Sequence, residues 1–195
     1  MEPKLFESIL NKFIISWEGE GPNLDLNAEI QKEDGERIGK IVLGGSHLEK
    51  AYLFDIDDEI ILFTQRRGGW LGLNRYEIKD SNKNIVGTAK MKFRPLNVKM
   101  IMENPQGVEI LRAEIEYLRN QKTSNKFNQV DGTNIAEFDI VTKEIKQSFW
   151  KHNCHNTCSL TIHNFNYDRK ILFGFFVAYI ISDYDLPPGA GGSVG

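Results

Sequence analysis

Three cations alternate with two apolar residues in one short segment of the chain. Lys90, Lys92 and Arg94 are separated by Met91 and Phe93. In a β-strand, residues two apart point to the same face, so this spacing places the cations on one face and the apolar side chains on the other. A phosphate group could bind to such a face, because Arg forms paired hydrogen bonds to phosphate and Lys supplies a compact charge.

Three further cations could extend this row. Lys99 lies on the strand predicted to follow, and Arg66 and Arg67 lie in a neighbouring predicted loop. We therefore predict that these six residues form a binding site for the phosphate of an anionic lipid. The alternative is an ordinary solvated strand face, because the outward side of a sheet is polar in any case.

A second cluster combines side chains that can bind zinc. Cys154, His155 and Cys158 lie close together in the chain, and His152 and His163 flank them. Thiolates and imidazoles are zinc ligands. However, the Cys-x3-Cys spacing differs from the Cys-x2-Cys of zinc knuckles, and adjacent residues point apart in an extended chain. We predict an exposed loop with reduced thiols and no bound metal, and a metal-binding or redox protein is the alternative.

No group of residues has the pattern of a catalytic centre. Gly44-Gly45-Ser46 and Gly68-Gly69-Trp70 lack the Gly-Lys-Ser/Thr sequence that completes a phosphate loop. The acidic run 55–59 lacks the remaining ligands of a calcium loop and indicates a connection between strands. We expect a protein that is not an enzyme and that carries no cofactor.

Composition limits the class of protein and its partners. The 195 residues are 41% hydrophobic, which is enough for one domain with a sizeable core. A net charge of −3 argues against a general nucleic-acid binder, which would need a basic excess. The first residues show no secretory signal, and two cysteines are too few for a disulfide scaffold. We expect a cytoplasmic protein, peripheral at the membrane if it binds lipid.

Runs of alternating apolar and polar residues, joined by turn-forming residues, dominate the sequence. Turns are predicted at Asp34-Gly35, 80–84, 104–107 and Asp131-Gly132. Counting the runs predicts about twelve strands, of which 108–117 could instead form a helix, and 3–12 is predicted as a short amphipathic helix. The predicted strands are residues 13–17, 28–32, 38–43, 51–55, 60–65, 75–79, 85–93, 98–102, 108–117, 127–130, 135–142 and 159–165.

The longest apolar run, 171–181, predicts a buried helix over about 169–182. Asp168 can cap this helix, and Pro187-Pro188 would block its continuation. Eleven helical residues span only about 16 Å, against the roughly 30 Å of a bilayer core. A core strand is the alternative for this run.

A helix that is apolar on every side must be surrounded on every side. Because almost no other helix is predicted, the surrounding element must be a sheet. We therefore predict a mainly β fold, a closed antiparallel barrel of about twelve strands around the buried C-terminal helix. It forms one domain over 1–186, followed by a flexible Gly-rich tail at 187–195.

The hairpins and the closing helix resemble the superfamily of tubby C-terminal domains, phospholipid scramblases and LURP-one-related proteins. The likeness rests on the Glu-Ile…Asp-Gly…Ile-Gly hairpin at 29–39, the Tyr-x-Ile-x-Asp…Ile-Val-Gly hairpin at 76–87, and the segment 168–185. It extends over about 10–186. The resemblance implies a twelve-stranded barrel around a central helix. It also implies a connection to membrane lipids, because tubby domains bind phosphoinositides and scramblases are associated with phospholipid movement.

The chain departs from the scramblases in ways that affect the expected activity. Scramblases carry a cysteine cluster that is palmitoylated and an acidic calcium segment before the helix. Residues 161–167 contain no run of carboxylates, so we do not expect calcium-dependent scrambling. We expect a non-enzymatic module that binds an anionic phospholipid or a phosphoinositide at the membrane surface. A small-ligand carrier and a protein-interaction scaffold are further alternatives.

Overall fold

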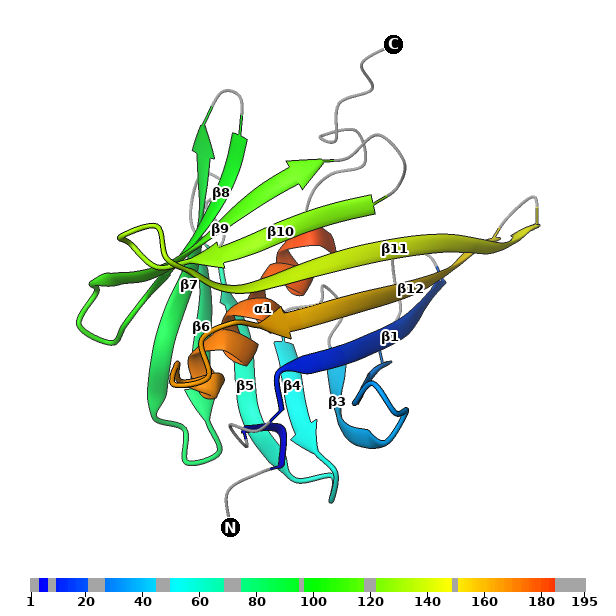
Figure 1. Ribbon diagram of the computed structural model, residues 1–195, viewed down its shortest axis with the longest axis horizontal. Coiled ribbons are helices and arrows are strands. Elements are labelled where there is room, and N and C mark those ends of the chain that lie inside the picture. The colour runs from blue at the N-terminus through cyan, green and yellow to red at the C-terminus, as the bar shows by residue number, and fades with distance from the viewer. Residues whose placement is uncertain are drawn as a thin grey trace.

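Alternating burial along the strands gives the sheet one apolar face and one exposed face. In the strand at 27–31, Ala28 and Ile30 are buried while Asn27 and Glu29 are exposed. A sheet of this kind must cover its apolar face with another layer or close on itself. The computed structural model shows a closed barrel of twelve antiparallel strands around one helix (Figure 1).

The structure describes most of the barrel, the helix and the connections at one end. The described residues are 4–6, 10–20, 27–44, 50–68, 75–94, 97–117, 122–148 and 151–184. Within these ranges, side chains are not described for residues 4, 19–20, 91–94, 97–99, 114–117, 122–124, 142–148, 151–154 and 183–184.

Each strand pairs with its neighbours in the chain, and the first strand pairs with the last to close the barrel. A short 3-10 turn, η1 (Lys4–Phe6), precedes the strands, and helix α1 (Arg169–Tyr184) follows them. The strands are β1 (Lys12–Glu20), β2 (Asn27–Gln31), β3 (Arg37–Gly44), β4 (Lys50–Asp55), β5 (Ile60–Arg67), β6 (Arg75–Asp80), β7 (Ile85–Arg94), β8 (Asn97–Glu103), β9 (Glu109–Tyr117), β10 (Lys122–Asn128), β11 (Asn134–Ser148) and β12 (Lys151–Ile162).

The predicted fold class is confirmed, with corrections to individual elements. The segment that could have been a helix forms β9. Strand β10 begins well before the predicted 127–130, and β12 begins at Lys151 rather than near residue 159. The predicted amphipathic helix at 3–12 is wrong at its end, because residues 10 and 11 are not helical and β1 starts at Lys12. The predicted tail, 187–195, lies outside the described residues.

Five hairpin turns share one hydrogen-bonding pattern. Each joins two strands through a three-residue loop, and in each the last loop residue has a positive φ. A pairing irregularity lies beside every one of these turns, as expected for a turn with a β-bulge. Because they form every second connection, all five lie at the same end of the barrel, which we call the turn end. The positive-φ residues are Gly35, Asp58, Lys83, Gly107 and Gly132.

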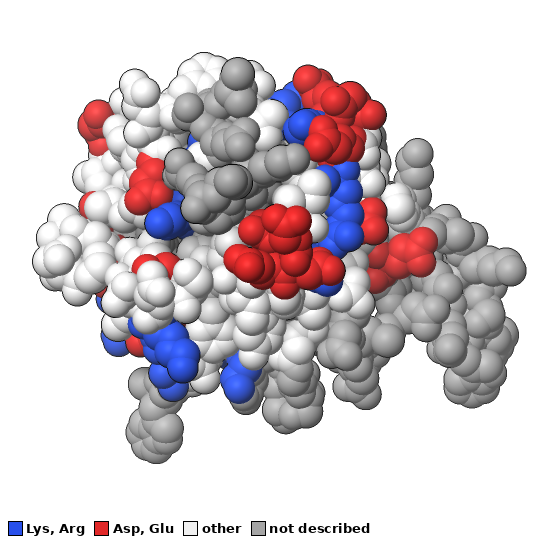
Figure 2. Space-filling model, turned by 90° about the horizontal axis from the view of Figure 1, so that it is seen from below, with Lys and Arg blue, Asp and Glu red and all other residues white. Residues whose placement is uncertain are grey.

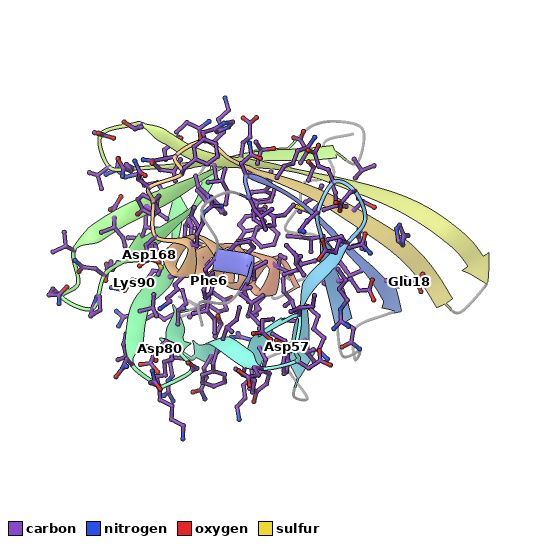
Figure 3. All side chains as sticks on the ribbon, turned by 60° about the horizontal axis from the view of Figure 1, so that its bottom comes forward. Phe6, Glu18, Asp57, Asp80, Lys90 and Asp168 are labelled. Atoms are coloured by element: carbon purple, nitrogen blue, oxygen red, sulfur yellow. The ribbon has the colours of Figure 1, made fainter. Side chains whose placement is uncertain are left out.

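Helix α1 begins at the turn end and is enclosed by the barrel. The Asp168 carboxylate accepts a hydrogen bond of 2.8 Å from the backbone N–H of Lys170, which confirms the predicted cap. Every residue from 172 to 182 is buried. Phe173 packs on Phe13 of β1, with ring centroids 5.1 Å apart. Phe6 of η1 lies against the same helix (Figure 3).

Aromatic contacts reach the helix from other sides of the barrel as well. The ring centroid of Phe175 lies 4.8 Å from that of Phe127 on β10, and Phe176 lies 5.3 Å from Phe138 on β11. The helix also contacts β4, β5, β6 and β7. Among the described residues, no helix has the length and apolar character needed to cross a membrane.

At Gly174 the helix packs tightly against the sheet. A Cβ atom at this position would lie 2.6 Å from Cγ2 of Ile78 on β6, closer than van der Waals contact allows. Ile is branched at Cβ and stiff at χ1, so its Cγ2 cannot easily move away. The glycine therefore sets how near the helix can lie to this wall of the barrel.

We predict that Gly174→Ala destabilises the protein by about 1–3 kcal/mol in urea unfolding, because the added methyl group overpacks the core. The same change should cost less in an Ile78→Ala background, where the clashing group is absent. Gly68→Ala is the control, since a Cβ there meets nothing within 4 Å. Equal unfolding midpoints for Gly174→Ala and the wild type would contradict the packing described here.

Candidate anion-binding surface

The predicted cations lie on strands at the end of the barrel opposite the turn end. Arg66 and Arg67 are the last two residues of β5, and not part of a loop. Lys90 lies within β7. The backbone register places Lys92 opposite Lys99. The side chains of three predicted residues lie outside the described residues: Lys92, Arg94 and Lys99.

The strand register separates Arg66 from Arg67. Arg66 lies opposite Tyr76, which lies opposite Ala89, and both of these residues are fully buried on the inner face. Directly opposed residues on paired strands point to the same side of the sheet. Arg66 therefore belongs to the inner face and Arg67 to the outer face, so the expectation that both extend one surface does not hold.

Arg67, Arg75 and Lys90 lie side by side on the outer face. The register pairs Arg67 with Arg75 and Arg75 with Lys90. The side chain of Arg67 is 54% exposed and that of Lys90 is 25% exposed, and Arg75 is also exposed. Neighbouring strands lie about 4.8 Å apart, so the three cations span about 10 Å across three strands. We call these three residues the cationic row.

Arg75 was missed by the sequence analysis, although a signal for it exists. The segment Arg75-Tyr76-Glu77-Ile78-Lys79 alternates strictly between charged and apolar residues. This alternation predicts that Arg75 lies on the outer face of a strand between the two strands that carry Arg67 and Lys90. Which residues lie directly opposite depends on the register, which the sequence does not show.

The cationic row is only partly neutralised by neighbouring carboxylates. The Arg67 guanidinium lies 3.1 Å from the Glu77 carboxylate, and Lys90 forms an ion pair with Glu103. Among the described residues, Arg75 has no ion-pair partner. Like charges directly opposite one another destabilise a sheet, so the row carries an electrostatic cost that a bound anion would reduce.

The charge of β5–β8 differs from that of the whole chain. These four strands contain eight Lys and Arg residues and three Asp and Glu residues, whereas the chain has a net charge of −3. A local excess of this size attracts anions even when the whole protein is slightly acidic. The sheet thus concentrates positive charge on one side of the barrel.

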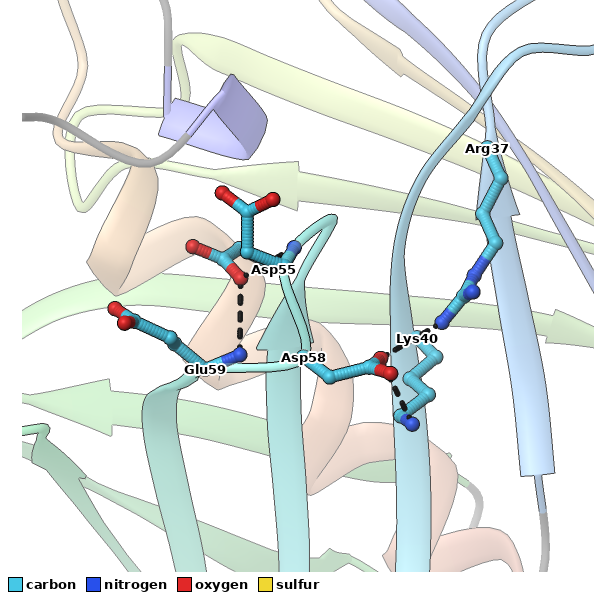
Figure 4. A network of polar contacts seen from close by, with 6 residues as sticks. Arg37, Lys40, Asp55, Asp58 and Glu59 are labelled. Atoms are coloured by element: carbon cyan, nitrogen blue, oxygen red, sulfur yellow. Dashed lines mark hydrogen bonds and ion pairs between the residues drawn. The ribbon is translucent and has the colours of Figure 1, made fainter.

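The acidic run at 55–59 is a strand connection, as predicted, and the carboxylates of Asp55 and Asp58 have partners. Asp55 accepts hydrogen bonds of 3.0 Å from the backbone N–H groups of Asp57 and Glu59. The Asp58 carboxylate lies 2.9 Å from both Arg37 and Lys40 (Figure 4). The view of the molecule from below shows a compact acidic group bordered by Lys and Arg residues (Figure 2).

The predicted Cys and His cluster does not lie in an exposed loop. Residues 151–162 form β12, which pairs with β1 on one side and β11 on the other. Cys158 lies opposite Ile15 on the inner face and is fully buried. Burial raises the pKa of this thiol well above its usual value, and the charge of Asp139 adds to the effect. The prediction of an exposed loop was therefore wrong for this segment.

The described candidate ligands do not meet. His155 lies on the outer face, with Nδ1 3.9 Å from Oε1 of Glu18. His163 follows β12, and its Nε2 lies 3.5 Å from Oε1 of Glu137. Cys158 faces the interior, and the side chain of Cys154 lies outside the described residues. In the part of the chain that the structure describes, no three His, Cys, Asp or Glu side chains are grouped to hold a metal ion.

A surface cavity of about 440 Å³ lies where the ends of β12, β1 and β2 meet. Glu18, one of its residues, lies toward the end of β1, away from the helix (Figure 3). The carboxylates of Glu18 and Glu29 give it a charge opposite to that of the cationic row, so the two are separate features. Three strands contribute to it, and no local sequence signal indicates it. The lining residues are Ser16, Trp17, Glu18, Asn27, Glu29 and His155.

We predict that the thiol of Cys158 does not react in the folded protein, because it is buried and its pKa is raised. In a Cys154→Ser variant, Cys158 is the single thiol, so a colourimetric disulfide reagent should modify it only at the rate of unfolding. The rate should increase with urea in parallel with the unfolded fraction. Rapid and complete modification in native buffer would show that the β12 register is incorrect.

The comparisons with known proteins show the fold and nothing further. Neither a protein-family model nor a curated protein matches the chain. Among solved structures, the chain is similar to the X-ray structure of a protein from Arabidopsis thaliana, AT5G01750. The TM-score is 0.52 at 12% sequence identity, and the match covers 94% of this chain and 99% of that chain. At this identity the similarity extends to the shared barrel architecture alone.

Proposed function

We propose that the protein is a non-enzymatic module that binds anionic membrane phospholipid through the outer face of β5–β8. One observation carries this proposal: Arg67, Arg75 and Lys90 are directly opposed on three neighbouring strands. Cations in this arrangement repel one another, and an anion held between them removes the repulsion. Two guanidinium groups offer paired hydrogen bonds to phosphate oxygens, and the ammonium adds charge.

The dimensions and stiffness of the site suit a lipid headgroup. A row about 10 Å long on a flat strand face can contact one phosphate or two adjacent ones, and it remains accessible to a membrane surface. Each Lys or Arg held near an anionic membrane contributes about 1 kcal/mol of attraction. Three further cations, at positions 92 and 94 on β7 and at position 99 on β8, would enlarge the surface.

The architecture supports the proposal that the chain is a member of the tubby-like superfamily, which includes the LURP-one-related proteins and the scramblases. A twelve-stranded barrel around a C-terminal helix is what the resemblance implies. Within this proposal the protein is cytoplasmic and peripheral at the membrane, with anionic phospholipid as its partner. Residues 161–167 supply no carboxylate run, so we do not propose calcium-dependent scrambling.

The test is sedimentation with vesicles of phosphatidylcholine and phosphatidylserine. We expect the triple variant Arg67→Gln, Arg75→Gln and Lys90→Gln to bind about tenfold to a hundredfold more weakly than the wild type. Wild-type binding should also weaken as salt rises, because the attraction is electrostatic. Stability should change little, since surface substitutions usually shift it by less than about 0.5 kcal/mol each.

A matched control is the triple variant Lys12→Gln, Lys32→Gln and Lys126→Gln. It removes the same charge, and, as in the cationic row, two of its residues form ion pairs while the third has none among the described residues. If the proposal is correct, this control binds vesicles nearly as well as the wild type. If both variants lose vesicle binding equally, only the net charge matters. If both bind vesicles as well as the wild type, the cationic row has no role in binding.

A further inference from the structure

An apolar surface lies on the outside of the barrel, where the alternation of the strands predicts polar residues. On β4 and β5, the inner face is already buried through Ala51, Leu53 and Leu62. The outer face of β4 and β5 toward the turn end is nevertheless apolar, and Val42 of β3 adjoins it. We call this surface the aromatic patch, and its residues are Val42, Tyr52, Phe54, Ile60 and Phe63.

The strand register makes the aromatic patch continuous. Tyr52 lies opposite Val42 on one side and opposite Phe63 on the other. Phe54 lies opposite Ile60. The ring centroids of Tyr52 and Phe63 are 5.3 Å apart, and those of Tyr52 and Phe54 are 6.3 Å apart. The three rings thus form one cluster on the outer surface.

Strands that are apolar on both faces are normally covered on both faces. The segments Ala-Tyr-Leu-Phe in β4 and Ile-Ile-Leu-Phe in β5 have this composition. However, Ile60 at the margin of the patch is 42% exposed, and the three rings are partly exposed. A contiguous exposed apolar surface of this kind marks a contact with a protein or a membrane.

The charges beside the aromatic patch favour a membrane as its binding partner. The Asp58 carboxylate is shared by Arg37 and Lys40, each 2.9 Å away. The Glu77 carboxylate is likewise shared, by Arg67 at 3.1 Å and by Lys79 at 2.7 Å. Along β6 one negative charge thus meets two positive ones, so this border of the patch carries a net positive charge, whereas at the β4–β5 turn the exposed Asp57 and Glu59 add two further carboxylates.

These border charges persist over a wide pH range. The hydrogen bond from Lys40 lowers the pKa of Asp58, and the hydrogen bond from Lys79 lowers that of Glu77, each against a smaller opposing effect of desolvation. Both carboxylates thus stay ionised and keep their two cations in place. The Lys40 ammonium also lies 4.9 Å from the ring centroid of Phe54, which holds the cation beside the aromatic cluster.

We propose that the aromatic patch enters the interfacial layer of an anionic membrane while its border cations face the lipid phosphates. This inference rests on the proposed function and adds to it the orientation of the barrel. Phe63, Gln65 and Arg67 alternate along β5, so the patch and the cationic row share one outer face. Aromatic side chains favour the membrane–water interface, and the flanking cations match anionic headgroups.

The test compares two double variants. One combines Phe54→Thr with Phe63→Thr, and the control combines Ile14→Thr with Val141→Thr. Threonine keeps the preference for strands while removing apolar surface. Ile14 and Val141 lie on β1 and β11 and are also partly exposed. Thermal unfolding of both variants confirms that each remains folded. Binding to phosphatidylcholine and phosphatidylserine vesicles is then measured at about 0.1 M and about 1 M salt, where the Debye length falls from about 10 Å to about 3 Å.

We expect the Phe54 and Phe63 variant to bind about tenfold more weakly than the wild type at both salt concentrations, because apolar insertion is not screened. The triple variant at Arg67, Arg75 and Lys90 should also bind more weakly than the wild type, but this difference in binding should become smaller at high salt. The control should bind as the wild type does.

Each possible failure of this experiment has a separate meaning. Normal binding of the Phe54 and Phe63 variant at both salt concentrations overturns the orientation and leaves the lipid-binding proposal standing. A wild type that binds no vesicles overturns both. Concentration-dependent dimerisation that this variant abolishes would assign the aromatic patch to contact between two copies of the chain, and would also overturn the inference.

Discussion

The structure depends on the burial of a helix that is apolar around its whole circumference. Such a helix cannot lie on the surface of a sheet, because its outward side would remain in water. Burying each large apolar side chain contributes about 1.5–3 kcal/mol, so the helix as a whole represents more than the typical net stability of a domain, about 5–15 kcal/mol. Closure of the barrel around residues 172–182 is therefore a condition for the fold.

Enclosing the helix decides which surfaces are available for function. The inner faces of the strands pack against α1, and aromatic rings from β1, β10 and β11 reach it from separate directions. At the turn end, carboxylates such as Asp55 and Asp80 accept backbone hydrogen bonds within their own turns. The outer faces of the strands remain, and the strands β5–β8 carry a positive excess that the rest of the chain does not share.

Local patterns were sufficient for the elements whose causes are local. Four of the five hairpin turns followed from Asp-Gly and Asn-containing segments, and the helix followed from one long apolar run with Asp168 before it. Strand β12 was placed too late, because its first half, Lys-His-Asn-Cys-His-Asn-Thr, has no apolar alternation. Its strand geometry comes from hydrogen bonding to the preceding strand β11 and to β1, which is distant in sequence. The prediction of a helix over 3–12 was wrong at its end for a similar reason. Strand β1 begins at Lys12 because its residues pair with β12, and this pairing closes the barrel.

The candidate site shows the same division between local and non-local causes. The spacing of Lys90, Lys92 and Arg94 predicted a cationic strand, but only the register reveals that Arg75 lies between Arg67 and Lys90. Three like charges on adjacent strands oppose the stability of the sheet, and the partly exposed rings on β4 and β5 leave apolar surface in contact with water. Departures from local rules of this kind are expected where function, and not stability, has determined the residues. Because β5 carries both the aromatic Phe63 and the cationic Arg67 on its outer side, both departures lie on one face. That face is supported from behind by the packed helix, which contacts β4 to β7, so it forms a rigid surface for binding.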